Sequence, residues 1–183
     1  MNYRYCLIDS KFGDIALVWT DDLEIKIKRI FLPVRFQTTD SLAERSFRGA
    51  RRTGIDEVVG LAEKIQSFLA GEDIKFDLDM IDIQACPSFQ QKVLKAEHMI
   101  PRGWISTYGR IAWALGKPKN SRAVGNALAK NPFPIVIPCH RAIRSDGSLG
   151  GFQGGMAMKQ WFLEREGIEF SLPGVVKMTR IYY

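Results

Sequence analysis

The sequence predicts an α/β N-terminal domain followed by a mostly α C-terminal domain with a winged-helix-like helix-turn-helix. Strand-like runs fill the first third of the chain, and two short helical patterns meet at a Gly/Pro turn in the second half. Residues 1–88 hold 12 Lys and Arg against 15 Asp and Glu, net −3, whereas residues 89–183 hold 14 against 5, net +9. We therefore expect domains at residues 1–85 and 86–183.

Three segments in the first third are expected to be strands, at residues 3–9, 14–20 and 24–32. Each is short, rich in β-branched and aromatic residues, and in part alternates between apolar and polar side chains. Lys11-Phe12-Gly13 and Asp21-Asp22 supply turns between them. The chain is therefore expected to begin with a sheet.

The rest of the first domain combines a connection, a helix and a last strand. Residues 33–54 are polar, rich in arginine and weakly periodic, which indicates an irregular, solvated connection. Residues 56–70 repeat apolar side chains at helical spacing and precede Gly71, as expected of an amphipathic helix. Alternation over residues 75–83 predicts a strand that leads out of the domain. Because residues 1–85 contain no recognisable chemical motif, we interpret them as a scaffold.

The composition argues against several classes of protein. Cys6, Cys86 and Cys139 are an odd and widely spaced set, which indicates a reducing compartment and a free thiol rather than a disulfide framework. With no Cys-x-x-Cys and only His98 and His140, a zinc site is not expected. The charged N-terminus and the lack of about 18 consecutive apolar residues predict neither a signal peptide nor a membrane span. We therefore expect a cytoplasmic protein, or a nuclear one in a eukaryotic host.

The second domain is expected to contain a pair of short helices after an initial helix. That initial helix is predicted at residues 89–99, with Ser88 as its cap. Residues 105–116 read as a cap and a short helix, and a second helix begins at Asn120 or Ser121 after a Gly/Pro turn. This is the helix-turn-helix pattern, whose second helix normally enters a groove of DNA.

The second of the paired helices is built largely from small residues, including Ala123 and Gly125. Such a surface could approach a sugar-phosphate wall closely, which suits minor-groove docking and the reading of shape more than base-edge readout. A packed contact between two helices would also need small residues, so that alternative stays open. The net charge of +9 favours a phosphate-backbone partner, although a merely soluble basic surface would carry the same charge.

An apolar run with three prolines, residues 131–138, leads to a thiol beside an imidazole. Prolines fix φ and remove backbone donors, so the run is neither a regular helix nor a central strand. Burial raises the pKa of a thiol, so Cys139 needs a base, and His140 is the candidate. Because neighbouring side chains diverge, we expect a bridging water between them. A core cysteine with a capping histidine is the alternative.

Ile137-Pro138-Cys139-His140-Arg141 resembles the active-site motif of the O6-alkylguanine-DNA alkyltransferases. The resemblance extends, with its spacing intact, from Phe89 to about Glu166. It implies a suicide DNA repair protein that moves an alkyl group, such as methyl, from O6-alkylguanine in double-stranded DNA irreversibly onto Cys139. It also implies minor-groove binding, no metal or other cofactor, no obligate protein partner and a monomer.

The resemblance assigns catalytic roles to Cys139, His140, Glu166, Tyr108 and Asn131. Cys139 would be the nucleophile and His140 its base, with Glu166 fixing the imidazole as the third member of a triad does. Tyr108 would help rotate the nucleotide and donate a hydrogen bond to the leaving guanine. Asn131 would tie the recognition helix to the cysteine segment.

The DNA contacts that the resemblance implies involve Ser121, Arg122, Ala123, Gly125 and Tyr108. A damaged guanine cannot be reached inside a duplex, so it must be flipped out of the base stack. Arg122 would enter the stack at the position that the nucleotide leaves, because a planar guanidinium can stack in the gap.

The implied pocket for the base comprises Pro134, Ala142, Phe152, Gln153 and Gly154. The last three lie in a loop with five glycines between residues 147 and 155, which allows close backbone approach. The Gln153 amide would face the guanine O6, and the carbonyls of Cys139 and Ala142 would accept from the exocyclic amine. Pro134 and Gly154 would border the alkyl group. Phe152 replaces a tyrosine common in the family, and Gln153 is also unusual, which leaves the substrate range open.

Two alternatives from other classes stay open. A sensor of the alkyltransferase-like kind would bind alkylated DNA without transfer, but such proteins lack the reactive cysteine. A cysteine hydrolase would use Cys139, His140 and Glu166 with repeated turnover. Residues 167–183 contain no motif that separates these possibilities.

Overall fold

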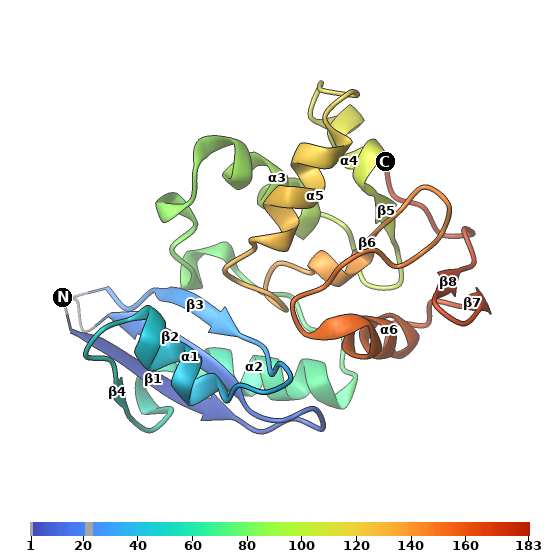
Figure 1. Cartoon of the computed structure of the whole chain (residues 1–183). Helices are drawn as coiled ribbons and strands as arrows, with labels where there is room; N and C mark the ends of the chain where they lie inside the picture. The colour runs from blue at the N-terminus through green and yellow to red at the C-terminus, as the bar shows by residue number, and fades with distance from the viewer. Residues whose placement is uncertain (1, 21–23) are drawn as a thin grey trace. The chain divides into compact units, whose positions relative to one another are not determined.

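In the computed structural model, residues 2–20 and 24–183 are described, and the chain divides into two compact units (Figure 1). One unit contains Met1–Ile83 together with Pro132–Val136, and the other contains Gln84–Asn131 and Ile137–Tyr183. The turn expected at Asp21-Asp22 lies outside the described residues. The chain therefore leaves the second unit and returns to it just ahead of the cysteine motif.

The first unit is built on a four-stranded sheet in the order β3-β2-β1-β4. β1 (Tyr3–Ile8) pairs antiparallel with β2 (Ile15–Thr20), and β2 pairs antiparallel with β3 (Ile27–Phe31), so the three predicted strands are confirmed. β4 (Arg51–Arg52) adds to the sheet by pairing parallel to β1. All six residues of β2 are buried, as expected of a strand covered on both faces.

The irregular connection predicted at residues 33–54 is wrong in two places, because it contains helix α1 (Thr39–Ser46) as well as β4. The Thr38 hydroxyl caps α1 by accepting a hydrogen bond from the Ser41 N–H at 3.3 Å. The helix buries only two side chains, neither of them large. Its apolar stripe is short, since Leu42 and Phe47 pack beside Ala43 but are only partly buried, and so it gives periodicity a weak signal.

The strand predicted at residues 75–83 is also wrong. Two 3₁₀ turns, η2 (Leu78–Met80) and η3 (Ile83–Ala85), interrupt the extended backbone, and an isolated bridge at Ile81 is its contact with the sheet. The alternation has another origin, because apolar side chains such as Phe76 and Ile81 are buried one at a time along the stretch. Apolar side chains that are buried one at a time give the sequence the alternation of a strand, even where the backbone forms no ladder of hydrogen bonds.

The helix predicted at residues 56–70 is confirmed as a 3₁₀ turn, η1 (Asp56–Val58), that continues into α2 (Val59–Ala70). Its buried face repeats at helical spacing and comprises Leu61, Ala62, Ile65 and Phe68. Gly71 ends the helix in the left-handed region at φ 103°, a conformation that glycine adopts without steric cost.

Four α-helices lie in the second unit: α3 (Ser88–His98), α4 (Tyr108–Ala114), α5 (Ser121–Ala129) and α6 (Gly155–Arg165). The first three match the helices expected from the sequence, and residues 115–120 join α4 to α5. The predicted cap at Ser88 is wrong, because Pro87 takes the cap position and Ser88 is already helical. Within residues 2–20 and 24–183, no helix is long and apolar enough to cross a membrane.

Two short strand pairs complete the second unit. β5 (Ser106–Thr107) pairs parallel with β6 (Ala142–Ile143), which brings the start of α4 beside the segment that follows the cysteine motif. β7 (Phe170–Leu172) and β8 (Val175–Val176) form an antiparallel pair after α6. The first pair connects segments that are far apart in the sequence, whereas the second is a local hairpin.

The C-terminal residues are hydrogen-bonded to the segment that precedes α4. The Tyr182 N–H donates to the Ile105 carbonyl at 2.7 Å, and the Ser106 hydroxyl donates to the Tyr182 carbonyl at 2.8 Å. Residues 167–183, which contain no motif, therefore hold β5 and the first turn of α4 in place.

Candidate active site

Cys139 begins a 3₁₀ turn, η4 (Cys139–Arg141), at the end of the proline-rich run. The Cys139 N–H donates to the Ile137 carbonyl at 2.7 Å, and the Arg141 N–H donates to the Pro138 carbonyl at 2.8 Å. Because proline fixes φ and removes a donor, these residues form a tight turn rather than a longer helix. The turn buries three consecutive side chains that carry a thiol, an imidazole and a guanidinium.

The Cys139 thiol is almost fully buried and accepts a hydrogen bond from the Asn131 side-chain amide at 3.2 Å. Burial raises the pKa of this thiol to about 11, although the Asn131 hydrogen bond acts in the opposite direction. The thiol is therefore protonated at neutral pH, and it needs a base to become a nucleophile.

Glu166 joins His140 and Arg141 in a buried cluster. His140 Nε2 lies 2.9 Å from Glu166 Oε1, and Arg141 donates from Nε to Oε2 at 2.8 Å and from Nη2 to Oε1 at 2.7 Å. Burial alone would raise the pKa of Glu166, but His140 and Arg141 lower it to about 2. The carboxylate is therefore ionised, and the planar fork of Arg141 supplies the compensating charge.

The Glu166 carboxylate determines which nitrogen of His140 carries the proton. An ionised carboxylate only accepts hydrogen bonds, so Nε2 must donate, and a neutral ring then has no proton on Nδ1. Burial lowers the pKa of His140, which keeps the ring neutral near pH 7. The Phe162 ring packs against the imidazole at 5.1 Å between centroids. His140 is thus oriented to accept a proton through Nδ1.

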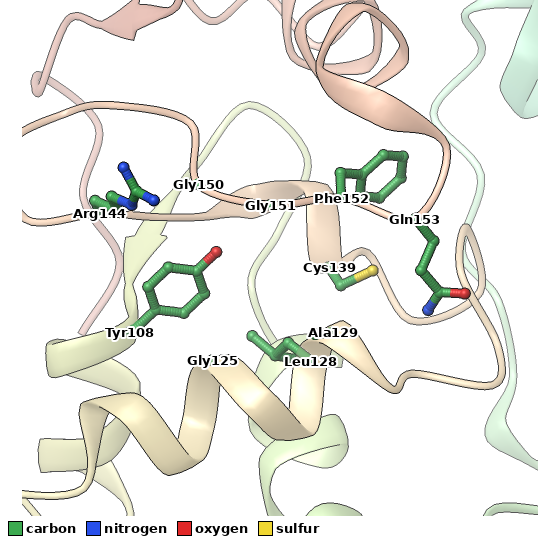
Figure 2. A pocket seen from close by; sticks show the side chains of 10 residues that line it. All are labelled: Tyr108, Gly125, Leu128, Ala129, Cys139, Arg144, Gly150, Gly151, Phe152 and Gln153. Atoms are coloured by element: carbon green, nitrogen blue, oxygen red, sulfur yellow. The ribbon is translucent and has the colours of Figure 1, made fainter. Parts of the chain in front are cut away.

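A pocket of about 340 Å³ adjoins the thiol, and its volume is in the range typical of small-molecule sites (Figure 2). Tyr108 enters it from α4, small residues of α5 form another wall, and the glycine-rich loop covers it. The lining comprises Tyr108, Gly125, Leu128, Ala129, Cys139, Arg144, Gly150, Gly151, Phe152 and Gln153. Among these, Tyr108, Gly125, Cys139, Phe152 and Gln153 were predicted from the sequence as site residues.

The Tyr108 ring is held between α5 and the glycine-rich loop. A Cβ atom at Gly150 would lie 2.6 Å from the Tyr108 hydroxyl, and one at Gly125 would lie 3.9 Å from the ring. Gly150 has φ 67°, so both its conformation and its contact with Tyr108 require glycine. Burial raises the pKa of Tyr108 to about 12, so its hydroxyl is neutral and can donate a hydrogen bond.

Asn131 links the end of α5, the cysteine turn and the glycine-rich loop. Its side-chain amide donates to the Ile137 carbonyl at 3.1 Å as well as to the thiol. Its own carbonyl accepts a hydrogen bond from the Gln153 side chain at 2.6 Å. These bonds connect three separate segments of the chain at the cysteine.

Other residues predicted for the site do not line this pocket in the described structure. Those of the second unit are the catalytic candidates His140, Asn131 and Glu166 and the predicted binding residues Ser121, Arg122, Ala123, Ala142 and Gly154. Arg122 lies exposed on the first turn of α5. Pro134 belongs to the other compact unit. No group of three or more His, Cys, Asp or Glu within residues 2–20 and 24–183 could hold a metal ion.

Sequence reasoning missed three charged residues at the site: Glu97, Lys159 and Arg144. Lys159 is fully buried on α6, and its Nζ donates to the Ala142 carbonyl at 2.6 Å. Glu97 is fully buried on α3, and its carboxyl oxygens have no hydrogen-bond partner within the part of the chain that the structure describes. Burial raises the pKa of Glu97 to about 8 and lowers that of Lys159 to about 8.

A signal for two of these residues is present in the sequence. Glu97 follows Val93 and Leu94 at the spacing of one helix face, and Lys159 lies next to Met158 on the buried side of α6. A charge at a core position of an amphipathic helix is an indication of a site.

A buried thiol next to an imidazole that a carboxylate orients, on the wall of a pocket, defines the class of proteins with a nucleophilic cysteine. Residues 88–168 match a family model described as the DNA binding domain of 6-O-methylguanine DNA methyltransferase. The methylated-DNA–protein-cysteine methyltransferase of Methanothermobacter thermautotrophicus is 39% identical over 156 residues, which cover 85% of this chain and 80% of that protein. The one from Shigella flexneri is 37% identical over 167 residues, which cover 89% and 88%.

Solved structures are similar over the same extent. The crystal structure of the Mycobacterium tuberculosis O6-methylguanine methyltransferase has a TM-score of 0.75 at 33% identity, and the match covers 90% of this chain and 92% of that one. The OGT of the same organism in complex with DNA has a TM-score of 0.73 at 32% identity, with 91% and 92% covered. The chain belongs to the methylated-DNA–protein-cysteine methyltransferase family.

Proposed function

We propose that this chain is a suicide DNA repair protein that transfers the alkyl group of O6-alkylguanine in duplex DNA irreversibly to Cys139. The observation that carries the proposal is the Cys139 thiol on a pocket wall, followed in sequence by an imidazole that Glu166 orients. The family relationship supplies the reaction, and the site supplies a nucleophile, a base and an orienting carboxylate. Because the thioether formed is stable, each molecule reacts once.

The transfer proceeds in two steps. His140 Nδ1 takes the thiol proton through a bridging water, while the Glu166 carboxylate stabilises the imidazolium that forms. The thiolate attacks the alkyl carbon, so that an S–C bond forms while the bond from carbon to O6 breaks, and its electron pair stays on the guanine. Tyr108 donates a hydrogen bond to the departing base. The proton on the imidazolium passes to the guanine, which leaves neutral, and no metal or other cofactor takes part.

Binding to duplex DNA is assigned to the minor-groove side, through α5. The helix pair α4 and α5 acts as a winged-helix-like helix-turn-helix, and the small side chains of Ser121, Ala123 and Gly125 allow α5 to approach the backbone. Arg122, exposed on the first turn, stacks in the gap that the flipped nucleotide leaves. The net charge of +9 over residues 89–183 supports the contacts to phosphates.

Recognition of the alkylated base is assigned to Ala142, Phe152, Gln153 and Gly154. Phe152 stacks on the base, and the Gln153 amide turns from a backbone carbonyl to the guanine O6. The Ala142 carbonyl accepts from the exocyclic amine with the lone pair that Lys159 does not use. Gly154 borders the alkyl group.

The two halves of the chain have different roles in this proposal. Residues 86–183 form the DNA-binding and alkyl-transfer domain, and residues 1–85 form a scaffold domain without chemistry of its own. The protein acts as a monomer without an obligate protein partner, in the cytoplasm or, in a eukaryotic host, in the nucleus.

Intact-mass spectrometry after incubation with a duplex that contains O6-methylguanine tests the proposal. The wild type should gain the mass of one methyl group, at most one per molecule, on Cys139. Cys139→Ala should gain none and should still bind the duplex. Product in excess of the protein would indicate a cysteine hydrolase, and binding without any mass gain would indicate an alkyltransferase-like sensor.

A further inference from the structure

Arg144 lies at one end of the pocket, beside Tyr108 (Figure 2). Its main chain is held in a turn, because its N–H donates to the Ser148 carbonyl at 2.9 Å and its carbonyl accepts from the Gly147 N–H at 3.1 Å. Its side chain is exposed to solvent. A fixed backbone position therefore presents a guanidinium at the edge of the pocket.

Arg144 is the one cation among the described residues that line the pocket. Within residues 2–20 and 24–183, its guanidinium makes no hydrogen bond or ion pair. The nearby Asp146 carboxylate accepts hydrogen bonds through Oδ1 from the N–H and the hydroxyl of Ser148 at 2.9 and 2.6 Å. These bonds and, to a smaller extent, the Arg144 charge lower the pKa of Asp146, but within the described chain Arg144 makes no ion pair with it. The positive charge of Arg144 is thus available to a ligand of the pocket.

The geometry of the pocket indicates which part of a nucleotide Arg144 would meet. The Tyr108 ring lies between Arg144 and Cys139 in Figure 2. A purine whose O6 edge faces the thiol directs its sugar towards the opposite end of the pocket, because O6 and the glycosidic nitrogen are on opposite sides of the ring system. The phosphates of the flipped nucleotide then lie at the Arg144 end.

We propose that Arg144 binds a phosphate next to the flipped nucleotide and so makes the protein favour DNA over a free alkylated base. This inference rests on the proposed function, and it adds a specificity-determining contact to it. A guanidinium presents paired N–H donors that match two phosphate oxygens. Such a charge-assisted contact contributes about ten- to a hundredfold in binding, and it is lost when the phosphate is absent.

Alkyl-transfer rates of Arg144→Ala and the wild type on two substrates test the proposal. The substrates are a duplex containing O6-methylguanine and the free base O6-benzylguanine, and mass gain on Cys139 is the readout for both. Arg144→Ala should lose about ten- to a hundredfold on the duplex and less than about twofold on the free base. The slope of log rate against log salt should fall by about 0.9, as expected for one phosphate contact. Arg144→Lys keeps the charge but not the paired N–H donors, and its rate on the duplex should lie between those of the wild type and Arg144→Ala.

Two comparisons separate this contact from a general effect of charge or folding. Lys95→Ala removes an exposed cation from α3, which contributes no residue to the pocket, and should leave the ratio of the two rates unchanged. In the second comparison, a neutral methylphosphonate replaces the phosphate on one side or the other of the O6-methylguanine. It should lower the wild-type transfer rate at one of the two positions. At that position it should not lower the rate of Arg144→Ala any further.

Three results would overturn the proposal: equal losses on both substrates, no loss on the duplex, or additive effects of the methylphosphonate and the substitution at both positions. A wild type that reacts with neither substrate would refute the proposed function itself, and the phosphate contact with it. A wild type that reacts with both, with Arg144→Ala unchanged, would refute the phosphate contact alone.

Discussion

Two buried carboxyl groups lie near Cys139, and their surroundings differ. Glu166 accepts two hydrogen bonds from Arg141 and has His140 at 2.9 Å, and these partners lower its pKa to about 2. Glu97 is as deeply buried, and burial raises its pKa to about 8 although the Lys159 and Arg141 charges and the Ala142 main chain act in the opposite direction. Partners at hydrogen-bond distance, not burial, therefore decide which carboxyl is ionised. Glu166 is a fixed negative charge at neutral pH, whereas Glu97 is mostly a neutral acid.

The largest effect is expected from Glu166→Gln, which removes the fixed charge. Arg141 then keeps a buried charge without its partner, so the free energy of unfolding should fall by about 3–5 kcal/mol. The amide also no longer stabilises the imidazolium of His140, so alkyl transfer should slow by about 10²- to 10⁴-fold. Urea unfolding and single-turnover mass gain measure the two effects. Glu169→Gln, at an exposed position, should change neither; a Glu166→Gln protein of wild-type stability would contradict the paired charge.

The ionised Glu166 carboxylate should also be visible in the dependence of the free energy of unfolding on pH, which does not require a measurement of alkyl transfer. The pKa of Glu166, about 2 in the folded protein, lies below its ordinary value of 4.5. The stability it contributes is therefore present above about pH 4.5 and is lost as the pH falls towards 2. We expect this group to account for about 3 kcal/mol of the free energy of unfolding lost in that window. Urea unfolding between pH 2 and 6 should give a shallower pH dependence for Glu166→Gln than for the wild type; parallel curves would be evidence against this shift.

Lys159→Met removes the buried ammonium near Cys139 and should have an intermediate effect on stability and on the transfer rate. It leaves the buried Ala142 carbonyl without the donor at 2.6 Å, which costs about 1–3 kcal/mol. The Lys159 charge also lowers the pKa of the Cys139 thiol, so its removal should slow transfer at pH 7 by a few fold and less at higher pH. A pH profile of the transfer rate separates this effect from a loss of structure, which would lower the rate equally at every pH.

The smallest effect is expected from Glu97→Leu, which replaces the neutral acid with an apolar side chain. The folded pKa of Glu97, about 8, lies above its ordinary value of 4.5, so the stability it contributes is present below pH 4.5 and is lost as the pH rises towards 8. The substitution should therefore change the free energy of unfolding at pH 7 by about 0 to 2 kcal/mol, in the stabilising direction. It should also flatten the dependence of stability on pH between 5 and 8. Destabilisation as large as that of Glu166→Gln would mean that both carboxyls are ionised and paired.

Local signals in the sequence were sufficient for much of the fold. Alternation predicted β1 to β3, and helical spacing with Gly71 predicted α2, because in these elements the buried face repeats with the period of the backbone. The proline-rich run and the adjacent Cys139 and His140 likewise predicted a cysteine site, since the chemistry of those residue types does not depend on distant partners.

Features that depend on distant partners could not be predicted in this way. Helix α1 was missed because it buries two small side chains, and residues 75–83 alternate without a partner strand to pair with. Glu97 and Lys159 lie at core positions of their helices, but only the fold shows that both are buried near the cysteine. Arg144 follows an apolar dipeptide in an otherwise unremarkable turn, and only the pocket gives it a role.

Glu166 holds His140 with one oxygen and the Arg141 fork with both, so a single carboxylate serves reactivity and folding together. No substitution at this position can alter one of these properties and spare the other. An engineer who wants a slower or faster version of the protein must therefore leave Glu166 alone and vary Lys159 or Glu97, whose charges also act on the thiol, at lower risk to the folded chain.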